Sequence, residues 1–333
     1  MTAIKDHRPV SRGTGFVSDD SSTAPAPRNR RGRGRRRGRF SFAPVVLLAP
    51  AGLLLAFVLG YPIIELIVSS FQDFGLRSLF VGGTSWVGLA NYVQVFTDPQ
   101  FIPVLLRTFI FTGLVVVGCV VVGMAMSQVM MRTGKALRVV LSVVLILAWA
   151  IPTVTSTLIW QWLFQPTYGV VNWFITSLHA FGDFSTYNWI SKPASAFLII
   201  GILILWQSVP FIALTLYAGQ SQIPAEYYEA AMLDGASGWR IYRSVTLPFL
   251  RPILYLVTIL SIIWHFNTFN QIWLLTQGGP DQGTTTLGIW SFQKAFAASD
   301  FGQGSAIAVV TAVILIVITA FYVRRLIRTG EAL

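Results

Sequence analysis

Six long apolar segments constrain the fold of this 333-residue chain more than any other feature. Each is long enough to cross the hydrocarbon core of a bilayer, which takes about 20 residues of helix. Unpaired backbone groups cannot be left in lipid, so helices are expected and open strands are not. With 54% hydrophobic and 11% charged residues, the sequence predicts an all-α membrane protein with six transmembrane helices. The expected spans are residues 43–71, 104–131, 139–163, 194–217, 251–275 and 305–327.

The first 42 residues have a different composition from the rest. They are rich in Arg, Gly, Ser and Pro and contain the run RNRRGRGRRRGRF from Arg28 to Phe40. Such a segment buries too little apolar area to fold, so we expect a disordered basic tail at 1–42 and a six-helix membrane domain at 43–333. Arg-Gly tracts also bind nucleic acid. Because the cluster directly precedes the first span, we favour anionic lipid headgroups as its partner and expect no nucleic acid.

The basic residues also predict the orientation. With the N-terminus in the cytoplasm, only four of the 24 Lys and Arg residues face outward, at Arg77, Arg107, Lys192 and Lys294. The positive-inside rule favours this arrangement. An even number of spans then places both termini in the cytoplasm, as expected for a multi-pass protein of the cell membrane.

A polar segment at 223–248 separates the fourth and fifth apolar segments. Pro224 is expected to open a short helix that ends near Leu233. Asp234-Gly235 should end it, because glycine adopts a left-handed turn without steric cost. A second short helix is expected to stop at Leu247-Pro248. The order is E-A-A, three residues, G, nine residues and V-x-L-P.

This order resembles the EAA loop of permease subunits in bacterial ABC importers, where Val245 is usually isoleucine. The resemblance implies the type I importer permease fold, with the loop docking as a coupling helix on a separate ABC ATPase dimer. It also implies that this chain binds no cofactor, since ATP and Mg²⁺ belong to the ATPase. The residues that it assigns to the coupling contact are Glu229, Ala230, Ala231, Asp234 and Gly235.

Two outer segments narrow the resemblance to carbohydrate importers. The patterns WVGLxNYxxVFxDPxF, from Trp86, and LTxGGPxxxTxTL, from Leu275, resemble the maltose-type subset. This subset pairs with a second, non-identical permease and with an extracellular sugar-binding (lipo)protein. The turn Gly278-Gly279-Pro280 is predicted to be a flexible loop that contacts the binding protein. The basic tail with six spans looks closest to actinobacterial trehalose-importer permeases, which implies a disaccharide such as trehalose or maltose.

Polar and aromatic residues in the fourth and fifth segments are candidates for the substrate pathway. On a regular helix with about 100° per residue, the four candidates of the fifth segment share one arc, with His265 outside it. Aromatic rings stack on sugars and amides pair with hydroxyls. The same amides could instead join helices to each other, and the resemblance favours passage. His265 is expected to pack against a neighbouring helix. The candidates are Trp264, Asn267, Asn270 and Gln271, with Trp206 and Gln207 near Pro210.

The sequence lacks the motifs of several enzyme classes. It contains no G-x-x-x-x-G-K-[ST], H-E-x-x-H or G-x-S-x-G motif, so we expect no ATP hydrolysis by this chain and no enzyme activity. One cysteine and three scattered histidines predict neither a disulfide nor a metal site. The alternative is a secondary transporter driven by an ion gradient, which needs carboxylates facing a cavity within the membrane. Only Glu65 is placed for that role.

Overall fold

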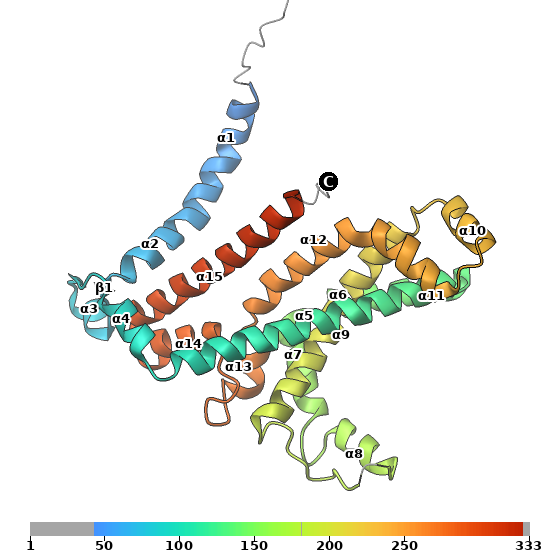
Figure 1. Ribbon diagram of the computed structural model, residues 1–333. Coiled ribbons are helices and arrows are strands. Elements are labelled where there is room, and N and C mark those ends of the chain that lie inside the picture. The colour runs from blue at the N-terminus through green and yellow to red at the C-terminus, as the bar shows by residue number, and fades with distance from the viewer. Residues whose placement is uncertain (1–42, 181, 329–333) are drawn as a thin grey trace, which may run out of the picture. The chain divides into compact units, whose positions relative to one another are not determined.

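The computed structural model describes residues 43–180 and 182–328 (Figure 1). The basic tail predicted at 1–42 therefore lies outside the described residues. The chain divides into two units, 1–54 and 55–333. In the first unit, the described residues belong to helix α1 (Ala43–Leu55), which carries no charged side chain.

The expected membrane helices are present in the described residues. Five helices are long and apolar enough to cross a membrane, and a sixth span is formed if a bent pair is counted as one. The five are Val46–Ser69, Phe101–Arg132, Pro193–Gln220, Gly238–Thr276 and Phe301–Ile327, and the pair is Lys135–Ala150 with Thr153–Leu163. The all-α prediction is confirmed.

The spans contain the following elements. The first includes the π-helical turn η1 (Ala56–Gly60) and α2 (Tyr61–Ser69). The others are α5 (Phe101–Arg132), the pair α6 (Lys135–Ala150) and α7 (Thr153–Leu163), α9 (Pro193–Gln220), α12 (Leu247–Phe266) with α13 (Asn270–Thr276), and α15 (Phe301–Arg328).

Short elements connect the spans. Between α2 and α5, β1 (Gln72–Asp73) pairs antiparallel with β2 (Ser85–Trp86), and the buried amide of Asn91 donates to the carbonyls of Ser70 and Gln72. The remaining elements are α3 (Leu76–Val81), α4 (Ala90–Thr97), α8 (Val170–Ser177), α10 (Ala225–Leu233), α11 (Gly238–Ile241), η2 (Tyr242–Thr246), α14 (Leu287–Phe292) and η3 (Gln293–Ala297).

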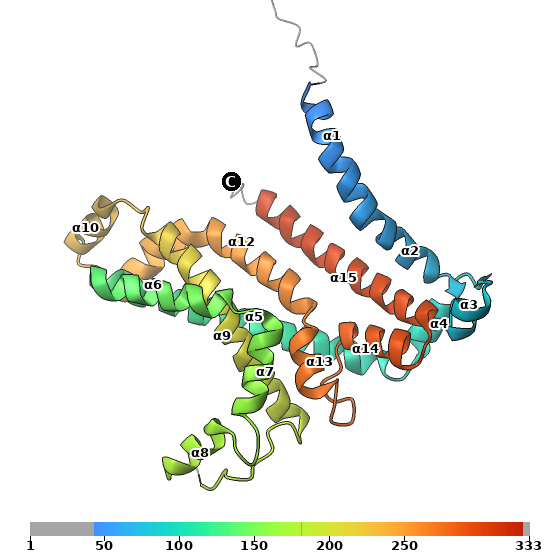
Figure 2. The same cartoon turned by 180° about the vertical axis from the view of Figure 1, so that it is seen from behind.

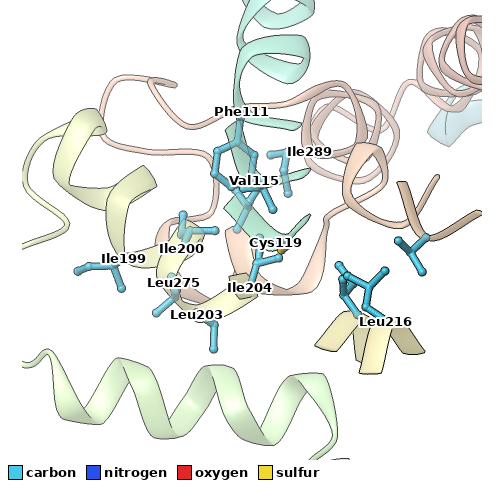
Figure 3. Close-up of a cluster of buried hydrophobic side chains, with 13 residues drawn as sticks. Phe111, Val115, Cys119, Ile199, Ile200, Leu203, Ile204, Leu216, Leu275 and Ile289 are labelled. Atoms are coloured by element: carbon cyan, nitrogen blue, oxygen red, sulfur yellow. The ribbon is translucent and has the colours of Figure 1, made fainter. Parts of the chain in front are cut away.

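The packing of α5 against α9 forms the centre of the second unit. Their shared core includes Phe111, Cys119, Ile200 and Leu203, with residues of α12, α13 and α14 packed beside it (Figure 3). Gly123 lets the two helices approach closely, because a Cβ atom there would lie 2.5 Å from Ile212 Cγ2. These two helices therefore form the frame around which the broken helices are arranged.

The third span is broken, since α6 and α7 meet at an angle of 97° on either side of Ile151-Pro152 (Figure 2). One expectation about a helix end is wrong. The second helix of the 223–248 segment does not stop at Pro248 but continues into α12. A proline lacks the N–H of the helix ladder and crowds the preceding turn. The π-helical turn η2 directly before Pro248 widens the helix and shifts its hydrogen bonds, so the helix continues.

Candidate functional site

Two helix breaks lie around Gln207 of α9. One separates α6 from α7 at Ile151-Pro152, and the other separates α12 from α13 at 267–269. A cavity of about 510 Å³ lies between them and is lined from both breaks and from α9. We call it the break cavity. Non-helical backbone at membrane depth is tolerated where it is buried in protein or lines a cavity, and this arrangement fits that rule.

The local sequence explains both breaks. Ile151 precedes a proline, which disfavours helical backbone, and it is extended at φ −69° and ψ 126°. At the other break, Asn267 ends α12, and its side-chain amide donates to the carbonyl of Ile263 at 3.3 Å. Such local bonds from asparagine compete with the helix ladder. Each break is therefore encoded by one or two residues.

The Gln207 side chain connects the two breaks. Its Nε2 donates to the hydroxyls of Thr153 and Ser156, both at 3.2 Å, and lies 3.4 Å from the carbonyl oxygen of Ile151. Its Oε1 accepts a bond from Gln271 Nε2 at 3.3 Å. One amide thus pairs with the start of α7 and with α13. A polar network of this kind specifies a unique arrangement only while every member is satisfied.

Aromatic rings form a wall beside this network. Trp264 packs edge-on against Phe211 with ring centroids 5.4 Å apart, and Phe211 stacks on Trp149 at 6.0 Å. Trp264 and Trp149 line the break cavity, and both are about half exposed. The cavity therefore combines open aromatic faces with the amides of Asn267 and Asn270.

Most of the pathway residues expected from the sequence lie together. Gln207 and four residues near the end of the fifth span line the break cavity, but not by the expected regular helical arc, since the helix breaks at Asn267. Trp206 is not among the lining residues. It packs on Trp160 at 6.1 Å, because its side chain points about 100° away from that of Gln207 on the helix. The four lining residues of the fifth span are Trp264, Asn267, Asn270 and Gln271.

Several lining residues were not among the candidates. Trp149, Ser208 and Thr268 belong to this group. In the sequence, Pro152 in the middle of the third apolar segment marks the first break. His265 is 6% exposed and packs as expected, with Nε2 3.9 Å from the sulfur of Cys119, and it also borders the cavity.

At the α10 end of the molecule, the 223–248 segment forms the expected helix and turn. Gly235 has φ +72°, the left-handed turn that the sequence predicts there. The N–H of Gly235 donates to the carbonyl of Met232, and the N–H of Ala236 donates to that of Ala231, both at 3.0 Å. This pair of bonds is a Schellman motif, which satisfies the last carbonyls of α10.

The α10 helix presents an apolar and acidic surface. Leu233 is 89% exposed and Met232 is 57% exposed, and Glu229 lies exposed on the same short helix. Two tyrosines of α10 anchor it to η2 and α12: Tyr228 hydrogen-bonds to Thr246 at 3.2 Å, and Tyr227 packs edge-on against Phe249 at 5.0 Å. We call α10 together with the turn that ends it, residues 225–235, the docking helix. Large exposed apolar side chains on an anchored helix are typical of a protein contact surface.

The loop between α13 and α14 is held by more bonds than a flexible loop would make. The hydroxyls of Thr284 and Thr285 donate to the carbonyls of Gly279 and Gly278 at 2.7 and 3.1 Å. Gly278 has φ +89°, and a Cβ atom there would lie 2.6 Å from Thr285 Oγ1. The sequence placed Gly278, Gly279 and Pro280 in a loop but could not show these bonds to residues further along the chain.

Arg107 of α5 fastens this loop to the membrane helices. Its Nη1 donates to the carbonyls of Gln282 and Thr285 at 2.9 and 3.1 Å. The next residue, Thr108, accepts a bond from the N–H of Leu287 at 3.0 Å. Consecutive residues of α5 thus hold the second half of the loop.

We expect Arg107→Met to loosen the loop. It removes two hydrogen bonds from a charged donor, each contributing about 1.5–3 kcal/mol. Hydrogen exchange of the amides of Thr284 and Thr285 should accelerate by at least about tenfold. The control is Arg77→Met, which removes an exposed cation from α3. Equal exchange rates in Arg107→Met and the unsubstituted protein would contradict this role.

Comparison with known proteins gives a consistent result. The model of the family described as "Binding-protein-dependent transport system inner membrane component" matches residues 119–329. The chain is 42% identical to the diacetylchitobiose uptake system permease protein DasB of Streptomyces coelicolor, over 87% of this chain and 88% of that protein. It is 34% identical to the trehalose/maltose transport system permease protein MalF of Thermococcus litoralis, over 74% and 81%.

A solved structure shares the fold. It is a chain of a bacterial ABC transporter involved in the import of the acidic polysaccharide alginate, with a TM-score of 0.73 at 20% identity. The match covers 86% of this chain and 96% of that one. At this identity the likeness shows a shared fold.

Proposed function

The chain belongs to the family of binding-protein-dependent transport system inner membrane components, and from that premise we propose that it is a permease subunit of an ATP-driven sugar importer. It forms half of the translocation pathway beside a second, non-identical permease. A separate ATPase dimer binds ATP and Mg²⁺. The observation that carries the proposal is the break cavity, where aromatic faces and side-chain amides of several helices meet.

The chemistry of the break cavity fits a carbohydrate. A sugar ring presents an apolar face that stacks on indole, and its hydroxyls both donate and accept. Trp264 and Trp149 supply rings, while Asn267 and Asn270 supply exposed amides. Among the described residues that line this cavity there is no carboxylate, lysine or arginine, and His265 is the one titratable side chain, which favours an uncharged solute. A volume of about 510 Å³ is enough for a disaccharide or part of a longer chain.

The relatives support a disaccharide as substrate. Their names specify diacetylchitobiose in one case and trehalose or maltose in another. Trehalose, the narrower expectation from the sequence, stays a prediction. The substrates to compare are therefore diacetylchitobiose, trehalose and maltose.

Coupling is assigned to the docking helix. We propose that Glu229, Ala230, Ala231, Asp234 and Gly235 contact the ATPase, with Leu233 and Met232 as its apolar part. The small side chains of Ala230 and Ala231 allow close approach, and Glu229 can pair with a basic residue of the partner. In this orientation the docking helix and both termini of the chain lie in the cytoplasm. The turn Gly278-Gly279-Pro280 lies on the outer side, where it contacts the binding protein. The Arg-rich tail would rest on anionic lipids.

The transport experiment tests the proposal directly. The chain would be reconstituted in liposomes with its second permease, its ATPase and its binding protein, and uptake of each labelled disaccharide would be followed. We expect uptake that requires both ATP inside and the binding protein outside. Uptake that continues without ATP and stops when the ion gradient collapses would instead establish a secondary transporter.

Trp264→Ala tests the assignment of the cavity. We expect the maximal uptake rate to fall about fivefold, equivalent to a loss of about 1 kcal/mol of stacking. The sugar concentration giving half-maximal uptake should not change, because the binding protein captures the solute. Trp206→Ala is the matched control, since Trp206 lies outside the cavity. Equal losses in both variants would show that tryptophan packing, and not the cavity wall, is responsible.

A further inference from the structure

A second cavity lies between the C-terminal end of α5 and the residues that follow the docking helix. Its volume is about 350 Å³, and its lining is mostly apolar. Met124 and Ala125 of α5 form one side, and Trp239 and Tyr242 form the other. The two rings stack on each other with centroids 5.8 Å apart and an interplanar angle of 23°. We call this space the α5–α11 groove.

Arg132 is the one charged residue among the described residues that line the groove. It is exposed, and no ion pair or hydrogen bond of its guanidinium occurs within the described part of the chain. The amide of Gln128, also in the lining, is already used, since it donates to Gln220 Oε1 at 2.6 Å. The groove therefore offers one unpaired cation at the end of an apolar space.

Other basic residues surround the groove without lining it. Lys135 lies three residues beyond Arg132, and Arg240 and Arg243 lie beside the two stacked rings in sequence; all three are exposed. The docking helix has three exposed acidic residues, and none of them lines the groove: Glu226, Glu229 and Asp234. The local charge is therefore complementary to an anion.

We propose that the α5–α11 groove binds an anionic phospholipid. The phosphate pairs with Arg132, an acyl chain lies against Met124 and Ala125, and the rings of Trp239 and Tyr242 sit at the headgroup level. Arginine, aromatic rings and an apolar surface in this order match the layers of a membrane interface. Basic pockets between membrane helices on the cytoplasmic side are typical sites for anionic headgroups.

The position of the groove connects the lipid to the docking helix. Trp239 lies on α11, only four residues after the Gly235 turn, whereas Arg132 and Met124 belong to α5. A lipid that contacts both α5 and α11 holds the end of the docking helix against the α5–α9 frame. The site is independent of which solute is transported.

Fluorescence quenching of Trp239 tests the site in the complete transporter complex. The complex would be placed in nanodiscs containing brominated phosphatidylglycerol or brominated phosphatidylcholine. The contribution of Trp239 is the difference between the unsubstituted complex and Trp239→Phe. We expect quenching to favour phosphatidylglycerol, and Arg132→Gln to reduce this preference about fivefold, as for the loss of one basic contact near the surface. Arg132→Lys should retain most of it.

Arg324→Gln is the control. It removes an exposed charge near the C-terminal end of α15, which the proposed topology places on the same side of the membrane as the groove, and it removes none from the groove itself. It should leave the preference unchanged. Equal quenching by the two lipids, or equal effects of Arg132→Gln and Arg324→Gln, would overturn the proposal. Displacement of the brominated lipid by soluble glycerol phosphate would also overturn it, since the groove would then bind a free phosphate compound and no lipid.

Discussion

Gly235→Val is expected to uncouple ATP hydrolysis from uptake and to lower sugar uptake at least about tenfold. The backbone at Gly235 has φ +72°, which a β-branched residue adopts only at a cost of about 1–3 kcal/mol. Relief of this strain breaks the Schellman bonds to Ala231 and Met232 and releases the end of the docking helix. Uptake in reconstituted liposomes and ATP hydrolysis by the same complex would be measured side by side.

Gly134→Val is a matched control. Gly134 lies directly before α6, has φ −64°, and has no atom within 4 Å of an added Cβ. Gly235 also has open space around its Cβ position, so the two substitutions differ mainly in backbone angle. Gly235→Asn should be milder, because asparagine tolerates the left-handed region. Normal coupled uptake by Gly235→Val at normal membrane levels would contradict the role of the turn.

Gln207→Leu is expected to have the second largest effect, with uptake reduced at least about tenfold and a lower melting temperature. It removes the bonds of this side chain to the hydroxyls of Thr153 and Ser156 and to the amide of Gln271. Each lost hydrogen bond contributes about 0.5–1.5 kcal/mol. The two helix breaks then lose the side chain that holds them together. Uptake and thermal unfolding of the purified complex would be measured.

The control for this substitution is Gln161→Leu in α7. Gln161 lies outside the break cavity, and no hydrogen bond of its side chain occurs in the described residues. Gln207→Glu separates geometry from donor chemistry, because it keeps the acceptor for Gln271 while removing the donors to Thr153 and Ser156. We expect it to impair uptake almost as strongly as leucine. Full uptake by Gln207→Leu would show that the network only joins helices.

The sequence predicted the parts of the fold that depend on local chemistry. Apolar segments of sufficient length became the membrane helices, since lipid allows few other structures. Gly235 was identified because glycine is the residue that reaches positive φ at low cost. Gln207, Trp264 and Asn270 were found because polar and aromatic side chains within apolar segments usually serve a cavity or a neighbouring helix.

The features that the sequence did not show depend on distant partners or on departures from regular helix. A helical arc through Asn267 assumes an unbroken helix, whereas the asparagine bonds its own backbone and ends α12. The turn η2 carries the chain past Pro248 by widening one turn, which no spacing of residues reveals. Arg107 lies 175 residues before Gln282, so its bond to the loop follows from the fold alone.

Isolation of the chain from its native membrane tests the central claim most directly. The tagged chain would be purified in mild detergent, and stoichiometric partners would be identified by mass spectrometry. We predict recovery of a second permease and of an ATPase containing a Walker motif. Recovery of the chain alone or as a homodimer, from membranes in which it is active, would contradict the account and indicate a self-sufficient transporter.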